Sequence, residues 1–188
     1  YARGRLPGAA RLFRADLTDC AAAARRAGLA ARPPRFAFNL VNTLRHLPSD
    51  AAVVAHLREM AAILAPGALY VVGLSLVDYG WLFPEEDVWT AARGRCRITQ
   101  VVNYLPPEPG TPRARRETVV SHLTVARPRG EEHADDRYDL HCFDRDQWRR
   151  VLRQAGVAHV ASCDGRGAEL GGRLLPYQLE VLRIPGPE

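Results

Sequence analysis

The chain has 188 residues, of which 47% are hydrophobic and 25% are charged. This balance suits one soluble globular domain with a buried core and excludes a disordered tail. No apolar run approaches the roughly 20 residues that a membrane-spanning helix needs, so we expect no membrane partner. The formal net charge is +5, and all 26 basic residues are arginines interspersed with acidic residues. This pattern favours a mixed-charge surface over a nucleic-acid interface.

The cysteines are widely spaced and form no CxxC pair. They are Cys20, Cys96, Cys142 and Cys163. Such spacing is typical of free thiols in a reducing compartment rather than of disulfides or zinc ligands, so we predict a cytoplasmic protein. We interpret His133, with Asp135 and Asp136, as part of a solvated acidic loop and predict no metal site.

Three short elements are predicted near the beginning of the chain. Residues 11–17 (RLFRADL) predict a short strand that ends in a polar turn at residues 16–19. Residues 20–29 are alanine-rich and predict a helix that Gly28 closes. Residues 36–41 (FAFNLV) form a compact apolar run, which is typical of a strand buried on both faces.

The next helix has the clearest pattern. Ser49 suits its N-cap. The face predicted to be buried consists of Val53, Leu57, Met60, Ala61 and Leu64. His56 is predicted on the opposite, polar face. Residues 68–76 predict a second apolar strand, and strand, helix and strand with short connections indicate a right-handed parallel crossover unit.

The pattern then changes to alternation of polar and apolar residues, which indicates antiparallel strands with one buried face. Strands are predicted over residues 95–104, 117–126 and 138–143, with residues 130–136 as an acidic loop. We therefore predict a three-stranded antiparallel insertion over residues 95–143.

The last part of the chain predicts a helix followed by two closing strands. Asp144 is placed to begin the helix, and Gln147 completes a capping box. Its predicted inner face consists of Trp148, Val151, Leu152 and Ala155. Gly156 ends the helix. Residues 157–163 and 175–184 then form a hairpin.

Three stretches together resemble the class I S-adenosylmethionine-dependent methyltransferases. They are RLFRADLTDC at residues 11–20, the stretch with LRHL and LAPG at residues 36–74, and RYDLHCFDRDQWRRVLRQAGV at residues 137–157. The resemblance implies a Rossmann-like α/β sheet with helices on both faces, an antiparallel closing hairpin and an antiparallel β insertion. It implies a single methyltransferase domain over residues 1–188. Its parts would be a Rossmann-like part (1–77), an insertion or lid (78–143) and the last helix with the hairpin (144–188).

Two family features are absent from these residues. The family's first loop, an acidic residue followed by G-x-G-x-G, is not present, nor is the acidic residue that ends its second strand. Residues 1–3 resemble the end of the helix after that strand. We therefore expect roughly 50 to 80 preceding residues with strands 1 and 2. We also expect an exposed apolar sheet edge and an inactive fragment when the chain stands alone.

The resemblance places the cofactor S-adenosyl-L-methionine at the turns that follow two strands. By resemblance, Asp16 accepts a hydrogen bond from the adenine amino group and Leu17 supplies a backbone amide and an apolar wall. Asn39, Leu40 and Asn42 would contact the methionine part and the reacting methyl group. Asp16 suits a helix cap equally well, and Asn42 also suits a cap or turn.

Five further residues are predicted to contact the substrate. His46 follows the same loop, although a packed histidine near a helix start is the favoured interpretation. Tyr79 and Trp81 follow the second apolar strand and are candidates for the pocket wall, or for packing of a lid. Tyr104 and His141 lie on the insertion. No spacing singles out a general base, so the catalytic residue stays unknown.

The resemblance predicts methyl transfer to a small-molecule acceptor. Methyl transfer from a sulfonium has a good leaving group, so alignment and desolvation are expected to dominate and no catalytic triad is needed. Two alternatives stay open: a methyltransferase-like domain that binds partners without catalysis, and a nicotinamide-dependent Rossmann enzyme. The acceptor atom and the oligomeric state are not predicted.

Overall fold

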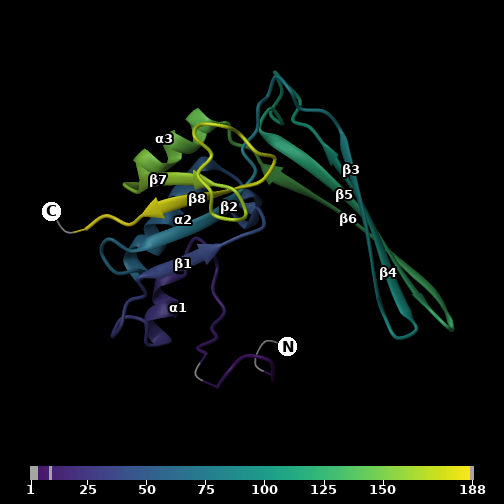
Figure 1. The fold of residues 1–188 in the computed structure, drawn as a ribbon, viewed down its shortest axis with the longest axis horizontal. Helices are drawn as coiled ribbons and strands as arrows, with labels where there is room; N and C mark the ends of the chain where they lie inside the picture. Colours follow the sequence, from purple (N-terminus) through teal and green to yellow (C-terminus); the bar gives the residue numbers. More distant parts are fainter. Residues whose placement is uncertain (1–3, 9, 187–188) are drawn as a thin grey trace. The chain divides into compact units, whose positions relative to one another are not determined.

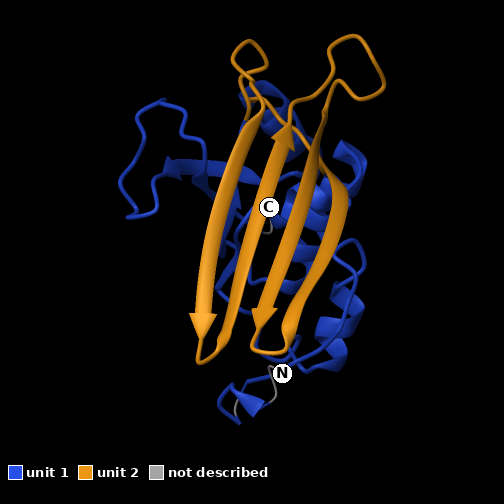
Figure 2. Cartoon of the chain, turned by 90° about the vertical axis from the view of Figure 1, so that its right-hand side faces the viewer, with its two compact units in different colours: residues 1–76, 145–188 blue, residues 77–144 orange. Residues whose placement is uncertain are grey.

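The computed structural model describes residues 4–8 and 10–186. The expected helix end at residues 1–3 lies outside them. Within the described residues, no helix is long and apolar enough to cross a membrane. The chain divides into two compact units (Figure 2): unit 1 comprises residues 1–76 and 145–188, and unit 2 comprises residues 77–144.

Unit 1 contains a four-stranded sheet in the order β1-β2-β8-β7 (Figure 1). The strands are β1 (Phe36–Asn39), β2 (Leu69–Leu74), β7 (Ala158–Cys163) and β8 (Gln178–Arg183). β1 is parallel to β2, with Phe38 opposite Val71. β8 is antiparallel to both β2 and β7. The predicted parallel crossover and closing hairpin are therefore confirmed, and β8 lies between β2 and β7.

The first helices of unit 1 are α1 (Ala21–Arg26), the 3-10 helix η2 (Thr43–His46) and α2 (Asp50–Ile63). As predicted, Ser49 caps α2: its Oγ accepts a hydrogen bond from the Ala52 amide at 3.2 Å. Val53 and Leu57 are fully buried. The prediction for His56 was wrong, since only 1% of this side chain is exposed. A buried histidine on the side assigned to solvent implies polar partners inside unit 1.

The last helix, α3 (Arg145–Ala155), buries the predicted face. Trp148, Val151 and Leu152 are at most 2% exposed. Gly156 follows with a φ of +72°, a left-handed conformation that suits glycine after a helix. This amphipathic helix is therefore where the sequence pattern predicted packing most accurately.

Two predictions at the start of unit 1 were wrong. Residues 11–17 form no strand, because a strand needs a hydrogen-bonded neighbour and the described residues supply none there. β1 is not buried on both faces: Phe36 is 57% exposed and Phe38 is 67% exposed. Among the described residues, β1 pairs only with β2. The expected exposed apolar edge is therefore present.

Unit 2 contains a four-stranded antiparallel sheet instead of the predicted three strands. The strands are β3 (Glu85–Arg93), β4 (Cys96–Leu105), β5 (Arg116–Arg127) and β6 (Gly130–His141). They follow one another in chain order, as Figure 2 shows. β3 was not predicted, and the predicted acidic loop is the first half of β6. β3 and β6 are the outer strands, and their charged residues other than Asp139 are exposed.

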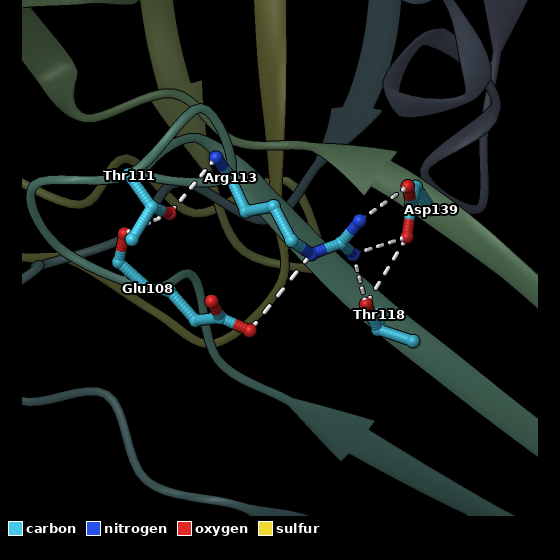
Figure 3. Close-up of polar contacts among 5 residues, drawn as sticks. All are labelled: Glu108, Thr111, Arg113, Thr118 and Asp139. Atoms are coloured by element: carbon cyan, nitrogen blue, oxygen red, sulfur yellow. Dashed lines mark hydrogen bonds and ion pairs between the residues drawn. The ribbon is translucent and has the colours of Figure 1, made fainter.

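The hydrophobic cluster of unit 2 is small and lies near one end of its sheet. It consists of Val102, Val119 and Leu140, with Tyr104 packed against them. The loop between β4 and β5 is held by Arg113, whose guanidinium binds the Asp139 carboxylate (Figure 3). The closer of these two N···O distances is 2.7 Å. This ion pair ties the loop to β6.

Candidate cofactor site

A cavity of about 320 Å³ lies in unit 1 between residues 13–20, β1 and α2. Its volume is at the lower end of the range of small-molecule sites, which is about 300–1,000 Å³. Three predicted cofactor residues, Asp16, Leu17 and Asn39, line it. The remaining walls are mostly apolar and include Phe13, Phe36, Phe38, Met60, Ile63 and Leu64. The structure therefore brings the turn after residues 11–15 and the end of β1 to one place.

The Asp16 carboxylate is a hydrogen-bond acceptor at this cavity. Its Oδ1 accepts hydrogen bonds from the Thr18 amide at 2.8 Å and from the Thr18 hydroxyl at 2.6 Å. These bonds lower the pKa of Asp16, so the group is an anion at neutral pH. Both bonds found in the described residues reach Oδ1, and Oδ2 therefore keeps acceptor capacity for a ligand.

A chain of two hydrogen bonds through the buried His56 connects the turn at Leu17 with β2. His56 Nδ1 lies 2.8 Å from the Leu17 carbonyl oxygen, and His56 Nε2 lies 2.8 Å from the Tyr70 hydroxyl. Because a carbonyl only accepts, Nδ1 carries the proton and Nε2 accepts from Tyr70. Asn39, at the end of β1, lines the same cavity as Tyr70. The two bonds of His56 hold Leu17 against α2 and β2.

Burial sets the charge state of this chain. It lowers the pKa of His56, which favours the neutral imidazole that the hydrogen bonds require. It also raises the pKa of Tyr70, which keeps the hydroxyl protonated. The sequence analysis missed both residues as parts of the site. A histidine and a tyrosine inside otherwise apolar elements were the signal that could have found them.

The loop after β1 has an unusual backbone. Val41 and Asn42 have φ values of 58° and 57°, a conformation that costs non-glycine residues of the order of 1–2 kcal/mol. The Asn42 side chain holds it: Nδ2 donates to Ser75 Oγ at 2.9 Å, and the Ser75 amide donates to Oδ1 at 2.6 Å. Strained backbone of this kind clusters at ligand sites. Neither Leu40 nor Asn42 lines the cavity.

The same loop contacts the closing hairpin. The Val41 amide donates to the Tyr177 hydroxyl at 2.9 Å. That hydroxyl lies against Gly73 of β2, where any Cβ atom would overlap it. Glycine is therefore required at this position for the loop, β2 and the hairpin to meet.

Of the predicted substrate residues, only His46 belongs to unit 1, and it does not line the cavity. His46 is exposed at the end of η2. Tyr79, Trp81, Tyr104 and His141 belong to unit 2, which is described separately. Within unit 2, the Tyr79 hydroxyl donates to the Cys142 carbonyl at 3.4 Å. Trp81 is 76% exposed, and His141 is buried edge-on to Phe143 at 4.7 Å between ring centroids.

No metal site is found in the part of the chain that the structure describes, since no three His, Cys, Asp or Glu side chains are grouped to hold an ion. The four cysteines are free thiols. Burial and the Glu59 carboxylate raise the pKa of Cys20, which lines the cavity, so this thiol stays protonated. The cavity therefore offers hydrogen bonds and apolar contacts rather than a nucleophile.

No protein-family model and no curated protein matches the sequence. Solved structures do match. DesVI from Streptomyces venezuelae is 19% identical with a TM-score of 0.69, and covers 98% of this chain and 69% of its own. The sugar N-methyltransferase KedS8 from Streptoalloteichus is 16% identical with a TM-score of 0.69, and the shares are 99% and 66%. The chain has a class I methyltransferase fold.

A third structure, an S-adenosylmethionine-dependent methyltransferase from Clostridium acetobutylicum, is 7% identical with a TM-score of 0.68. It covers 98% of this chain and 68% of its own. The chain thus spans about two thirds of the length of these structures. The predicted methyltransferase fold class, with its Rossmann-like sheet, closing hairpin and antiparallel insertion, is confirmed. At such low identity the likeness is one of fold.

Proposed function

We propose that this chain belongs to an S-adenosylmethionine-dependent methyltransferase that acts on a small-molecule acceptor. One observation carries the proposal: Asp16, Leu17 and Asn39, predicted from two separate stretches, line one cavity. The structural likeness supports it, since two of the matched structures are named as methyltransferases. Methyl transfer is the function that accounts for both.

The residues at the cavity fit the adenosine part of the cofactor. The Asp16 carboxylate would accept a hydrogen bond from the adenine amino group, and the Leu17 amide would donate to a ring nitrogen. Phe13 and Met60 offer apolar walls for the ring. Asn39, next to the strained loop, lies where the methionine part would follow. When bound, the cofactor supplies an electrophilic methyl group on a sulfonium.

The chain's own residues would act by positioning. The Leu17–His56–Tyr70 chain holds the turn at Leu17 in one geometry, and the apolar walls exclude water. Alignment and desolvation of this kind supply much of the acceleration in a displacement with a good leaving group. A general base is needed only for an alcohol or an ammonium acceptor. We assign none.

For the acceptor, we propose a small molecule with an amine or hydroxyl. Amino sugars are the first class to test, because KedS8 is named as a sugar N-methyltransferase. His46, Tyr79, Trp81, Tyr104 and His141 remain our candidates for contacts to it.

Calorimetric titration tests the cofactor. We expect S-adenosylmethionine to bind and NAD to give no heat. Asp16→Asn keeps an oxygen for Thr18 but presents an amide donor toward the adenine amino group, which should weaken binding about tenfold or more. The matched control is Asp164→Asn, since Asp164 Oδ1 makes a similar turn with the amides of Arg166 and Ala168.

The rival functions give different results. Binding of NAD would favour the nicotinamide enzyme. Binding of S-adenosylmethionine without turnover of any amino sugar or other small acceptor would favour the non-catalytic domain. Equal affinity of the Asp16→Asn and Asp164→Asn variants for S-adenosylmethionine would show that this cavity does not bind the cofactor.

A further inference from the structure

A second cavity, of about 230 Å³, lies at the other edge of the unit 1 sheet. It is formed by the start of α3, the outer strand β7 and the loop between β7 and β8. β1 and β7 are the two outer strands, so three strand spacings, about 14 Å, separate them. Among the described residues, the two cavities share no lining residue. The second cavity is therefore a separate place on the molecule.

Three arginines line this cavity from two elements. Arg145 and Arg149 lie one turn apart on α3, and Arg173 lies on the loop. One nitrogen of the Arg145 guanidinium donates to the Gly172 carbonyl at 2.7 Å, which holds the loop against the helix. Arg149 has an ion pair with Asp146 at 3.8 Å, and both side chains are more than half exposed. Such a pair stabilises little, so Arg149 keeps its capacity to bind a ligand.

The acidic groups at the cavity do not balance these arginines. Glu180, in the wall, is 1% exposed. Burial tends to raise its pKa, but hydrogen bonds outweigh this and hold the pKa below its usual range, so Glu180 is an anion. Its hydrogen-bond donors are Trp148, His159, Ser162 and Gln178. These donors occupy the carboxylate oxygens, and within the described part of the chain Glu180 forms no ion pair with the three arginines.

Three guanidinium groups and two carboxylates, the exposed Glu169 and the buried Glu180, therefore line one cavity, and Asp146 pairs with Arg149 at its rim. Like charges one helical turn apart repel each other, and an anion between them would remove that cost. Guanidinium groups bind phosphate oxygens through pairs of parallel hydrogen bonds. We propose that this cavity binds a phosphate group through Arg145, Arg149 and Arg173.

The test is a titration of the 188-residue chain with inorganic phosphate, followed by calorimetry and by the amide NMR shifts of Gly171 and Gly172, which line the cavity. Glucose 1-phosphate distinguishes an esterified phosphate from the free ion, and acetate is the carboxylate comparison. We expect both phosphates to bind and shift these amides, with affinity falling as salt rises, and acetate to bind at least tenfold more weakly.

Two variants and a control assign the binding to the arginines. Arg145→Gln/Arg149→Gln should weaken phosphate binding about tenfold or more. Arg149→Gln alone should weaken phosphate binding about threefold. Among the described residues the only partner of Arg149 is the exposed Asp146, so we expect this variant to keep the fold. The control is Arg97→Gln, which removes the same charge from an exposed position of unit 2.

The proposal is overturned if neither phosphate binds, or if acetate binds as tightly as phosphate. It is also overturned if the Arg97→Gln control weakens binding as much as the double variant. Binding of S-adenosylmethionine is a separate measurement, so failure at this cavity leaves the proposed cofactor site unaffected.

Discussion

His56 allows the sharpest test of how the cofactor cavity is built. Replacing His56 by leucine introduces an apolar side chain of similar size and removes both hydrogen bonds of the imidazole. The Tyr70 hydroxyl would then be buried without a partner, since Tyr70 is 1% exposed. An unsatisfied buried polar group costs about 1–3 kcal/mol. The Leu17 carbonyl is half-buried and would be satisfied by water, so we expect a total loss of about 2–3 kcal/mol.

The assay is urea unfolding followed by far-UV circular dichroism, with a double-mutant cycle. His56→Leu and Tyr70→Phe should each destabilise. The double variant should lose less than the sum, because no unpaired group is left, with a coupling energy of about 0.5–3 kcal/mol. His133→Leu, on the exposed strand β6, is the control and should change stability by less than about 0.5 kcal/mol. Additive losses in the cycle would refute the hydrogen-bond chain.

The pH dependence follows from the same histidine. Because the pKa of His56 is lowered in the folded state, the unfolded chain binds more protons once the pH falls below about 6.5. Stability is therefore fully present above that pH and is lost as the pH decreases from there toward the folded pKa. The His56→Leu variant should lose less stability over this range. An identical pH profile for the two proteins would argue against a neutral buried imidazole.

Three further changes test other contacts. Glu180→Ala leaves the buried donors of Trp148 and Gln178 without this acceptor and should cost about 3 kcal/mol or more by urea unfolding. The folded pKa of Glu180 is lowered, so its contribution is present above the unfolded pKa and is lost as the pH falls through the folded pKa. The variant should therefore show a shallower acid transition. Arg113→Ala removes the ion pair with Asp139, in which both side chains are about one third exposed. We therefore expect the free energy of unfolding to fall by at most about 1 kcal/mol and the pKa of Asp139 to rise in an NMR titration. An unchanged pKa would contradict the pairing. Gly73→Ala should lower the melting temperature by several degrees, and adding Tyr177→Leu should recover part of the loss; no recovery would show that the overlap is not with that hydroxyl.

Sequence periodicity was informative where one element packs on one side. The inner face of α3 is buried as predicted because apolar residues recur at the helical period over three turns. The burial of β1 depends instead on which strands lie beside it, and a local sequence such as FAFN does not indicate its neighbours in the sheet. The first half of β6 is rich in glutamate and aspartate, so it lacks alternation, and only its pairing with β5 makes it a strand.

The candidate cofactor site was partly predictable for a similar reason. Asp16 and Asn39 follow apolar segments, and polar residues in that position are readily assigned to a ligand. His56 is on the side of α2 that the pattern assigned to solvent, although it packs beneath Leu17 and beside Tyr70. Contacts between residues 17, 56 and 70 depend on three elements that meet only in the folded chain.

The way unit 2 is attached has a practical consequence. The Val77 amide donates to the Phe143 carbonyl at 2.9 Å, so the chain leaves unit 1 and returns to it side by side. Leu76 and Arg145, on either side of this junction, line the same cavity of unit 1. A short glycine linker in place of residues 77–144 would therefore span the junction without stretching the sheet. For the same reason, we expect that a longer or shorter antiparallel module in place of unit 2 would leave β2 and α3 in place.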